Sequence, residues 1–290
     1  MSSTRAPYPV IDLHVHIQPW EQLRPSVLAT MRHGRDNFEE LTALMHEPEA
    51  ILRLMDDAGI ERIGMINYVS PGLMGFTHEA NDFVAEIAHF APERLIAFGS
   101  VHPRFISDPG AEVERLAEMG IRALKVHPPH QEFASNAYLS DLPELGAVYA
   151  TAERLKMPVM IHTGTSIFPG ARNRFADPMD ADDVAVDFPD LQLILAHAGR
   201  PLYMETCFFL ARRHPNVHLD VSGIPPRRLL DYLPRLPEIA DKILWGTDWP
   251  GPGVPDMGTN ITQFLELGLA PDVERRILRD NACKLFSWHS

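Results

Sequence analysis

The sequence predicts one α/β domain, a (β/α)8 or TIM barrel that spans residues 1–290. Short, continuous apolar runs alternate with amphipathic helical stretches along the whole chain, as in parallel sheets whose strands are buried on both faces. The predicted strands end about 25–50 residues apart, near the size of one βα unit. No Pro-, Gly- or Ser-rich linker marks a second domain, and 290 residues exceed the roughly 250 that such a barrel needs.

Eight strand-then-helix units are predicted in order. The strands are expected to end near residues 16, 67, 102, 127, 162, 197, 221 and 248. Helices are expected at 48–58, 78–90, 109–119, 142–156, 181–188, 201–214, 227–240, 271–279 and 282–286. The polar stretch 18–46 is too long for an ordinary connection, so we expect it to be an excursion over the functional site. A doubly wound open sheet would instead need a glycine-rich phosphate loop after the first strand, where this chain has His-x-His and Gln-Pro-Trp.

Composition narrows the class of protein. A net charge of −13 argues against a nucleic-acid or anionic-membrane surface, since both need a basic patch. The two cysteines, Cys207 and Cys283, form no CxxC pair, which argues against a disulfide framework or a thiolate zinc site. No run approaches the roughly 18 apolar residues that span a bilayer, and no apolar signal segment precedes the first strand. We expect a cytoplasmic protein with a small-molecule substrate and no nucleic-acid or membrane partner; a homo-oligomer is left open.

Histidines and one aspartate fall at the ends of the predicted strands. His14 and His16 lie on one side of the first strand, and an isolated pair of this kind is more often a pair of surface histidines. Here His162, His197 and Asp248 recur at the ends of the fifth, sixth and eighth strands. Active sites of such barrels lie at these ends, and the first and eighth strands are neighbours in a closed barrel. Imidazoles and a carboxylate so placed suit Zn²⁺ or a similar divalent ion.

The motifs at residues 12–16, 161–164, 196–199 and 246–250 resemble those of the amidohydrolase superfamily, within it the amidohydrolase-related group of metal-dependent hydrolases and decarboxylases. The resemblance covers essentially the whole chain. It implies one divalent ion, in the first place Zn²⁺ with Mn, Fe or Co as alternatives, and the ligands His14, His16, His162 and Asp248. It also implies that His197 orients or deprotonates an attacking water, and Asp248 can share the proton transfer.

The sequence leaves two alternatives for the reaction, hydrolysis and decarboxylation. The first expectation is hydrolysis of a small ester, lactone or amide, which can carry a carboxylate. The second is non-oxidative decarboxylation of a small aromatic or muconate-like acid, because decarboxylases of this group use the same ligands. Two cues favour hydrolysis: residues 162–164 are closer to hydrolase-like members, and no carboxylate follows His197, whereas resorcylate-type decarboxylases have a nearby glutamate there. A catalytically silent barrel is disfavoured by the complete ligand set.

Five further residues are predicted to contact substrate. Lys125 and His127 share one face of the fourth strand and can reach the barrel interior. Some amidohydrolases carry a carboxylated lysine on that strand between two metals; we expect Lys125 to be unmodified because the rest resembles the mononuclear branch. Arg104 and Arg200 follow the third and sixth strands, where a guanidinium can bind a substrate carboxylate, with surface ion pairs as the alternative. Trp249 is expected to form an apolar wall or to pack in the core.

Overall fold

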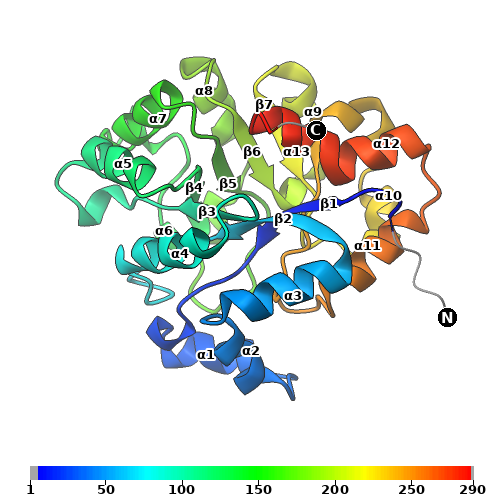
Figure 1. The fold of residues 1–290 in the computed structure, drawn as a ribbon. Helices are drawn as coiled ribbons and strands as arrows, with labels where there is room; N and C mark the ends of the chain where they lie inside the picture. Colours follow the sequence, from blue (N-terminus) through cyan, green and yellow to red (C-terminus); the bar gives the residue numbers. More distant parts are fainter. Residues whose placement is uncertain (1–5, 289–290) are drawn as a thin grey trace.

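The computed structural model describes residues 6–288, and it confirms the predicted (β/α)8 barrel (Figure 1). The strands form one sheet in the order β1 to β8, and all neighbouring pairs are parallel. Leu13 N donates to Trp245 O at 2.9 Å, and Val15 forms a parallel bridge with Trp249, so the last strand also meets the first. The strands are β1 Val10–Val15, β2 Ile60–Ile66, β3 Leu95–Gly99, β4 Ala123–Val126, β5 Val159–His162, β6 Leu193–Ala196, β7 Val217–Asp220 and β8 Ile243–Leu244.

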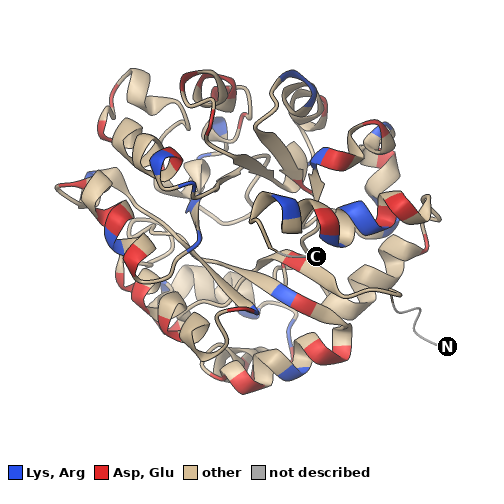
Figure 2. Cartoon of the chain, turned by 45° about the horizontal axis from the view of Figure 1, so that its top comes forward, with Lys and Arg blue, Asp and Glu red and all other residues tan. Residues whose placement is uncertain are grey.

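Helices cover the outside of this barrel, and most charged residues lie on them or on loops (Figure 2). No helix among residues 6–288 has the length and hydropathy needed to cross a membrane. The α-helices are α1 Pro25–Arg32, α2 Phe38–Leu44, α3 Pro48–Ala58, α4 Glu79–Phe90, α5 Pro109–Glu118, α6 Pro128–Gln131, α7 Glu144–Arg154, α8 Asp180–Asp187, α9 Met204–Arg213, α10 Leu229–Tyr232, α11 Met257–Leu265, α12 Pro271–Arg275 and α13 Asn281–Leu285.

The core has two parts. One lies inside the barrel, where side chains such as Leu13, Phe98 and Met160 pack together and Phe286 of the C-terminal segment packs against them. The larger part lies between the strands and the surrounding helices. The apolar strands therefore face apolar neighbours on both sides, which is why their sequences are continuous apolar runs and not alternating ones.

The excursion after β1 folds into short helices. It contains a 3₁₀ helix at Trp20–Gln22 followed by α1 and α2. Trp20 is fully buried and stacks on Phe38 with 5.3 Å between the ring centroids. Both rings lie within the excursion and belong to the same hydrophobic core as residues of the barrel, so the excursion is an ordered wall and not a loose loop.

Several predicted elements were wrong in extent. The helix predicted at 227–240 is α10 followed by a 3₁₀ helix at Leu236–Lys242, because Pro234 and Pro237 cannot donate the backbone hydrogen bonds of a continuous helix. Helices α1, α2, α6 and α11 were not predicted at all. The predicted limits of the domain include residues 1–5 and 289–290, which lie outside the described residues, so those limits stay a prediction.

Candidate metal centre

The carboxyl ends of the strands surround a cavity of about 200 Å³. Ligand pockets for drug-sized molecules usually hold roughly 300–1,000 Å³, so this cavity suits a small substrate. Its lining is part polar and part apolar. The polar lining includes His14, His16, Tyr68, Lys125, His127, His130, His162, His197, Arg200 and Asp248. The apolar lining includes Leu23 and Met31 of the excursion, Met74, Ile167, Phe168 and Pro252.

Strand β1 brings its two histidines to this cavity through a break in its pairing. The register between β1 and β2 shifts between Asp12 and Val15. Before the shift, Leu13 packs inside the barrel, and after it His14 and His16 line the cavity. Asp12 turns toward the end of β8, where its carboxylate accepts hydrogen bonds from Thr247. The neighbouring Asp248 N donates to His14 O at 2.8 Å, so His14 of β1 and Asp248 after β8 are held by contacts between the same two segments.

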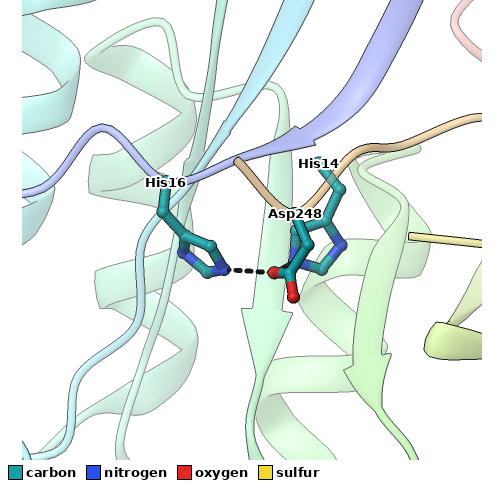
Figure 3. A group of neighbouring side chains, drawn as sticks. All are labelled: His14, His16 and Asp248. Atoms are coloured by element: carbon teal, nitrogen blue, oxygen red, sulfur yellow. Dashed lines mark hydrogen bonds and ion pairs between the residues drawn. The ribbon is translucent and has the colours of Figure 1, made fainter. Parts of the chain in front are cut away.

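His14, His16 and Asp248 form a compact group (Figure 3). Asp248 Oδ1 lies 3.0 Å from His16 Nε2 and 3.6 Å from His14 Nε2. One ligand atom from each of the three residues lies within 4.8 Å of the other two. His14 Nε2 is buried and has no hydrogen-bond partner among the described residues. A buried nitrogen without a partner, beside a second imidazole and a carboxylate, fits a divalent ion.

The charges of the group also fit a metal ion. Burial, together with nearby Lys125, lowers the pKa of His14 to about 4, although Asp220 raises it. Burial raises the pKa of Asp248, but the hydrogen bond with His16 and the nearby His14 and Arg200 outweigh burial and hold it well below its usual value. His14 is therefore neutral and Asp248 ionised near neutral pH, which are the forms that ligate metals.

His162, predicted as the fourth ligand, does not belong to this three-residue group. Its ring lies edge-on to His197 at 4.8 Å between centroids and stacks on His127 at 3.9 Å. Burial lowers the pKa of His162 well below its usual value, and its Nε2 is buried without a partner among the described residues. The structure thus leaves a neutral imidazole at the cavity, and its role as a ligand stays a prediction.

A stack of aromatic side chains continues from His162 along the cavity. His127 stacks on His130 at 3.6 Å between centroids. His130 Nδ1 lies 3.1 Å from the Tyr68 hydroxyl, and its Nε2 lies 2.7 Å from Ser166 Oγ. Tyr68 and His130 were not among the predicted site residues: Tyr68 follows the predicted end of the second strand, and His130 lies in the predicted loop after the fourth, but neither belongs to one of the motifs.

Two cationic side chains face the same cavity. Lys125 is 1% exposed, and its Nζ has no hydrogen-bond partner among the described residues. Burial lowers the pKa of Lys125 to about 8, against the raising effect of Asp220 and Asp248. Arg200 Nη2 lies 3.7 Å from Asp248 Oδ2, and its buried Nε has no partner within residues 6–288. Gly223 makes room for this guanidinium, since a Cβ there would lie 2.7 Å from Arg200 Nη2.

Two predicted substrate contacts lie elsewhere. Arg104 does not line the cavity. It donates to Glu132 O and to Asp141, both at 3.1 Å, and so forms the surface ion pair that was the alternative prediction. Trp249 is 7% exposed and lines a separate groove between the excursion and α11. The side chain after Asp248 thus points away from the cavity that Asp248 lines.

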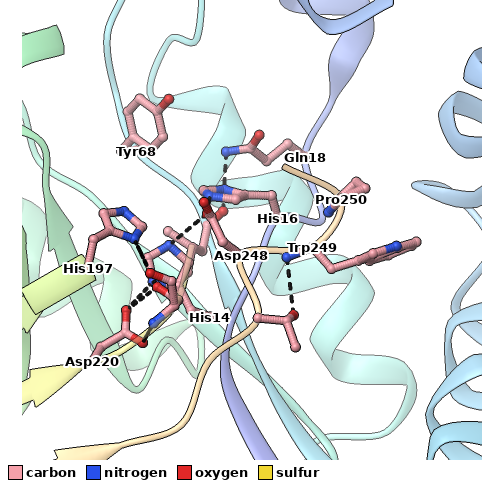
Figure 4. A network of polar contacts seen from close by, with 12 residues as sticks. His14, His16, Gln18, Tyr68, His197, Asp220, Asp248, Trp249 and Pro250 are labelled. Carbon is pink, nitrogen blue, oxygen red and sulfur yellow. Dashed lines mark hydrogen bonds and ion pairs between the residues drawn. The ribbon is translucent and has the colours of Figure 1, made fainter. Parts of the chain in front are cut away.

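Asp220, which sequence reasoning missed, lies beside His14 (Figure 4). Ser222, also missed, has its Oγ 3.0 Å from Nδ1 of both His14 and His197. Asp220 ends β7 and is fully buried. The rule that located the other residues, a polar side chain at a strand end, would have found Asp220 had it been applied to the seventh strand.

Comparison with known proteins shows the family of this chain. A family model described as Amidohydrolase matches residues 11–288. The chain belongs to the amidohydrolase family. No curated protein matches this amidohydrolase. Family membership and the group of His14, His16 and Asp248 together support a metal-dependent enzyme.

Solved structures similar to this amidohydrolase show the same fold at low identity. An uncharacterized TIM-barrel protein from Bordetella bronchiseptica is 22% identical, with a TM-score of 0.74 over 97% of this chain and 99% of that one. A 2,6-dihydroxybenzoate decarboxylase, complexed with 2,6-dihydroxybenzoate, is 21% identical, with a TM-score of 0.71 over 98% and 99%. The 5-carboxyvanillate decarboxylase of Novosphingobium aromaticivorans, complexed with manganese and 4-hydroxy-3-methoxy-5-nitrobenzoic acid, is 15% identical, with a TM-score of 0.66 over 97% of each chain.

Proposed function

We propose that this amidohydrolase is a metal-dependent, non-oxidative decarboxylase of a small aromatic acid. The observation that carries the proposal is Lys125, whose ammonium group is buried in the cavity without a partner among the described residues. A buried charge without a partner is unfavourable, so an anionic group of the substrate is the natural partner for it. Decarboxylation requires a substrate carboxylate in the site, which makes Lys125 an expected recognition group.

Arg200 further supports a substrate that carries an acidic group. Its Nε, like Lys125 Nζ, is a buried donor at the cavity without a partner in the described part of the chain. Asp248 is the one carboxylate among the described residues that line the cavity, and it already contacts His16 and Arg200. The remaining donors of Lys125 and Arg200 can therefore hold an acidic substrate by charge-assisted hydrogen bonds.

The lining of the cavity favours a partly apolar substrate. Phe168 and Met74 contribute apolar surface and Tyr68 an aromatic ring, whereas both faces of the His127 ring are covered by His130 and His162. Two of the similar solved proteins are named as decarboxylases of hydroxylated benzoic acids, one with its substrate and one with manganese and a nitrobenzoic acid. At 21% and 15% identity this likeness is only supportive, and the cavity of this chain carries the argument.

The residues present can carry out the proton transfers of the reaction. A divalent ion held by His14, His16 and Asp248, with His162 as the proposed fourth ligand, would polarise a substrate oxygen. In the reaction a proton adds to the ring carbon, the carbon–carboxylate bond breaks, its electron pair returns to the ring, and CO₂ leaves. Asp248 is ionised before the substrate binds, so it can take the proton of an acidic substrate hydroxyl and pass it to that carbon. The hydroxyl oxygen recovers a proton from solvent.

Hydrolysis of a small carboxylated ester, lactone or amide is the second candidate, and the position of His197 favours it. His197 Nδ1 lies 3.0 Å from Ser222 O, which can only accept, so the proton is on Nδ1 and Nε2 keeps its lone pair. Burial lowers the pKa of His197 well below its usual value, so the imidazole is neutral. A neutral imidazole at the cavity could accept a proton from an attacking water.

One experiment separates the two candidates. The protein loaded with Mn²⁺, and in parallel with Zn²⁺, is tested against hydroxybenzoic acids for CO₂ release and against carboxylated lactones and esters for acid release. Decarboxylation predicts CO₂ release that chelation abolishes and no acid release. Acid release without CO₂ release would assign hydrolysis instead, and no turnover in either panel would contradict both.

A further inference from the structure

We infer that Asp220 and Ser222, at the end of β7, act as a positioning unit that fixes the proton positions of His14 and His197 and so prepares the metal site. The inference rests on the metal centre of the proposed function, but not on its reaction. Neither residue lines the cavity, so each acts through the histidines and not on a substrate.

The hydrogen bonds around Asp220 can be arranged in one way only. Asp220 Oδ2 lies 2.6 Å from His14 Nδ1 and 2.6 Å from Ser222 Oγ, and Asp220 Oδ1 accepts from Ser222 N at 2.9 Å. An ionised carboxylate can only accept. His14 must therefore carry its proton on Nδ1, and the single hydroxyl proton of Ser222 points at Asp220.

The same unit reaches His197 from the other side. His197 Nδ1 lies 3.0 Å from Ser222 O and 3.0 Å from Ser222 Oγ. The Ser222 hydroxyl already donates its proton to Asp220, so it can only accept here, as the carbonyl does. His197 Nδ1 must then be the donor. Both imidazoles are thus left with an unprotonated Nε2.

The bare Nε2 of His14 is the atom that the metal centre needs. It is buried without a hydrogen-bond partner among the described residues and lies 3.6 Å from Asp248 Oδ1. Ligating histidines commonly donate their other nitrogen to a carboxylate, which fixes the ring and raises its basicity. Asp220 supplies that carboxylate to His14.

A second metal ion between His14, His197 and Asp220 is a different explanation for the same cluster, whose ligand atoms also lie within 4.8 Å of one another. The 2.6 Å between His14 Nδ1 and Asp220 Oδ2 contradicts it. Two atoms bound at about 2.1 Å to one ion in a tetrahedral arrangement lie more than about 3 Å apart. The distance is that of a short charge-assisted hydrogen bond.

The backbone packs tightly against Asp220 and His14 at Gly246. Gly246 follows β8 and passes directly over the contact between Asp220 and His14. A Cβ at Gly246 would lie 2.6 Å from Asp220 Oδ1, 2.6 Å from His14 Cβ and 3.0 Å from Ser222 Cβ. A side chain at this position would collide with both partners of the contact.

Metal affinity, measured without substrate, tests the inference. The apparent Kd for Mn²⁺ is measured by competition with a chelator for the wild type, Asp220→Asn and Ser222→Ala. In Asp220→Asn the introduced amide can donate an N–H to His14 Nδ1. This favours the tautomer that carries its proton on Nε2, the atom needed by the metal, so the variant should weaken Mn²⁺ binding by about 10–100-fold. Ser222→Ala keeps the carboxylate but removes one of its donors, so it should weaken binding by a smaller factor. The double variant should lose less than the product of the two, because the residues act together.

Asp182→Asn is the matched control. Asp182 Oδ1 lies 2.6 Å from His214 Nε2, the same kind of pair away from the cavity. Its loss should leave the Kd for Mn²⁺ unchanged. A folded Asp220→Asn with wild-type affinity would overturn the inference, as would an equal effect of Asp182→Asn. If Asp220→Asn does not fold, Ser222→Ala decides: wild-type affinity there overturns the inference. A wild type that binds no divalent ion overturns both this inference and the proposed function, whereas a different reaction class with the expected affinities overturns the proposed function alone.

Discussion

Asp12 and Thr247 join the first and last strands of the barrel beneath the metal centre. Asp12 Oδ1 accepts from Thr247 N at 3.0 Å, and Asp12 Oδ2 accepts from Thr247 Oγ1 at 2.7 Å. Asp12 Oδ1 also accepts from His14 N at 3.1 Å, and Thr247 Oγ1 accepts from Trp249 N at 3.1 Å. One fully buried carboxylate therefore organises the backbone that carries both His14 and Asp248.

We predict that Asp12→Ala destabilises the protein strongly, whereas Asp12→Asn destabilises it less. Each buried donor left without a partner costs about 1–3 kcal/mol, and alanine leaves the donors of Thr247 and His14 unpaired. Asparagine keeps one carbonyl oxygen for the two backbone N–H groups and can donate to Thr247 Oγ1. Urea unfolding of both variants measures the difference. Equal stability of Asp12→Ala and wild type would contradict the role of this contact.

The second prediction concerns the ion itself. We expect one divalent ion per chain, and we expect His14→Asn and Asp248→Asn to lose ion and activity together. His162→Asn should also weaken binding if His162 is the fourth ligand. Elemental analysis of each purified variant provides the measurement. A metal content near two per chain, or a mass increase that locates a carboxyl group on Lys125, would show a dinuclear site and contradict the expectation of an unmodified lysine.

Lys125 provides the third prediction. Lys125→Met removes the ammonium group but keeps a buried side chain of similar length. A hydrogen bond to a charged group is worth about 1.5–3 kcal/mol, so KM for an acidic substrate, or the Kd of an unreactive aromatic acid, should rise about 10–100-fold. Metal content should stay the same. Lys156→Met, at an exposed position outside the cavity, is the control. Unchanged affinity in Lys125→Met would remove the main support for an acidic substrate.

The sequence was a good guide to what lies at strand ends and a poor guide to what joins them. His14, His16 and Asp248 could be placed together because a closed barrel makes β1 and β8 neighbours, and in the structure one ligand atom of each lies within 4.8 Å of the other two. No sequence pattern shows that β1 changes register after Asp12. Simple alternation therefore could not tell that Asp12 turns to Thr247 while His14 and His16 face the cavity.

The remaining differences between prediction and structure concern loops and short helices. Arg104 follows β3 directly, as predicted, but a 3₁₀ helix at Pro103–Phe105 and the nearby Asp141 draw its guanidinium to the surface. Tyr68 and His130 come from loop and short-helix positions whose approach to the cavity depends on tertiary packing. Helix α11 begins at an aspartate, Asp256, that caps it by accepting from Thr259 N, and this capping signal in the sequence was overlooked.

His218 provides a prediction about pH, away from the metal centre. Burial, with Lys242 and Lys284, lowers its pKa from 6.5 to about 4. The folded protein thus prefers the neutral imidazole, and the unfolded chain binds the proton first. The stability from His218 is fully present above pH 6.5 and is lost as the pH falls from 6.5 toward 4. The slope contributed by one such proton is at most about 1.4 kcal/mol per pH unit.

His218→Leu should therefore reduce the loss of stability between pH 7 and pH 5. The free energy of unfolding, measured in urea at both pH values for wild type and variant, gives the difference directly. Other histidines with lowered pKa values, such as His102, contribute equally to both proteins and cancel in the comparison. An identical pH dependence in the two proteins would show that His218 does not titrate as the structure indicates.

The last prediction is that His197 acts in the reaction and is not needed to hold the ion. His197 lines the cavity, its Nδ1 is tied to Ser222, and its ring centroid lies 4.8 Å from that of His14. It does not belong to the group formed by His14, His16 and Asp248. Positioned acid–base groups are typically worth about 10²–10⁴-fold in rate. His197→Asn should therefore keep the fold and most of the ion but lose turnover by about that factor, whereas His14→Asn loses both. The exposed His46→Asn serves as a control for the substitution itself. Turnover per bound ion is the deciding measurement: if His197→Asn also empties the site, His197 is a ligand, and the proton transfer must be assigned to Asp248 alone.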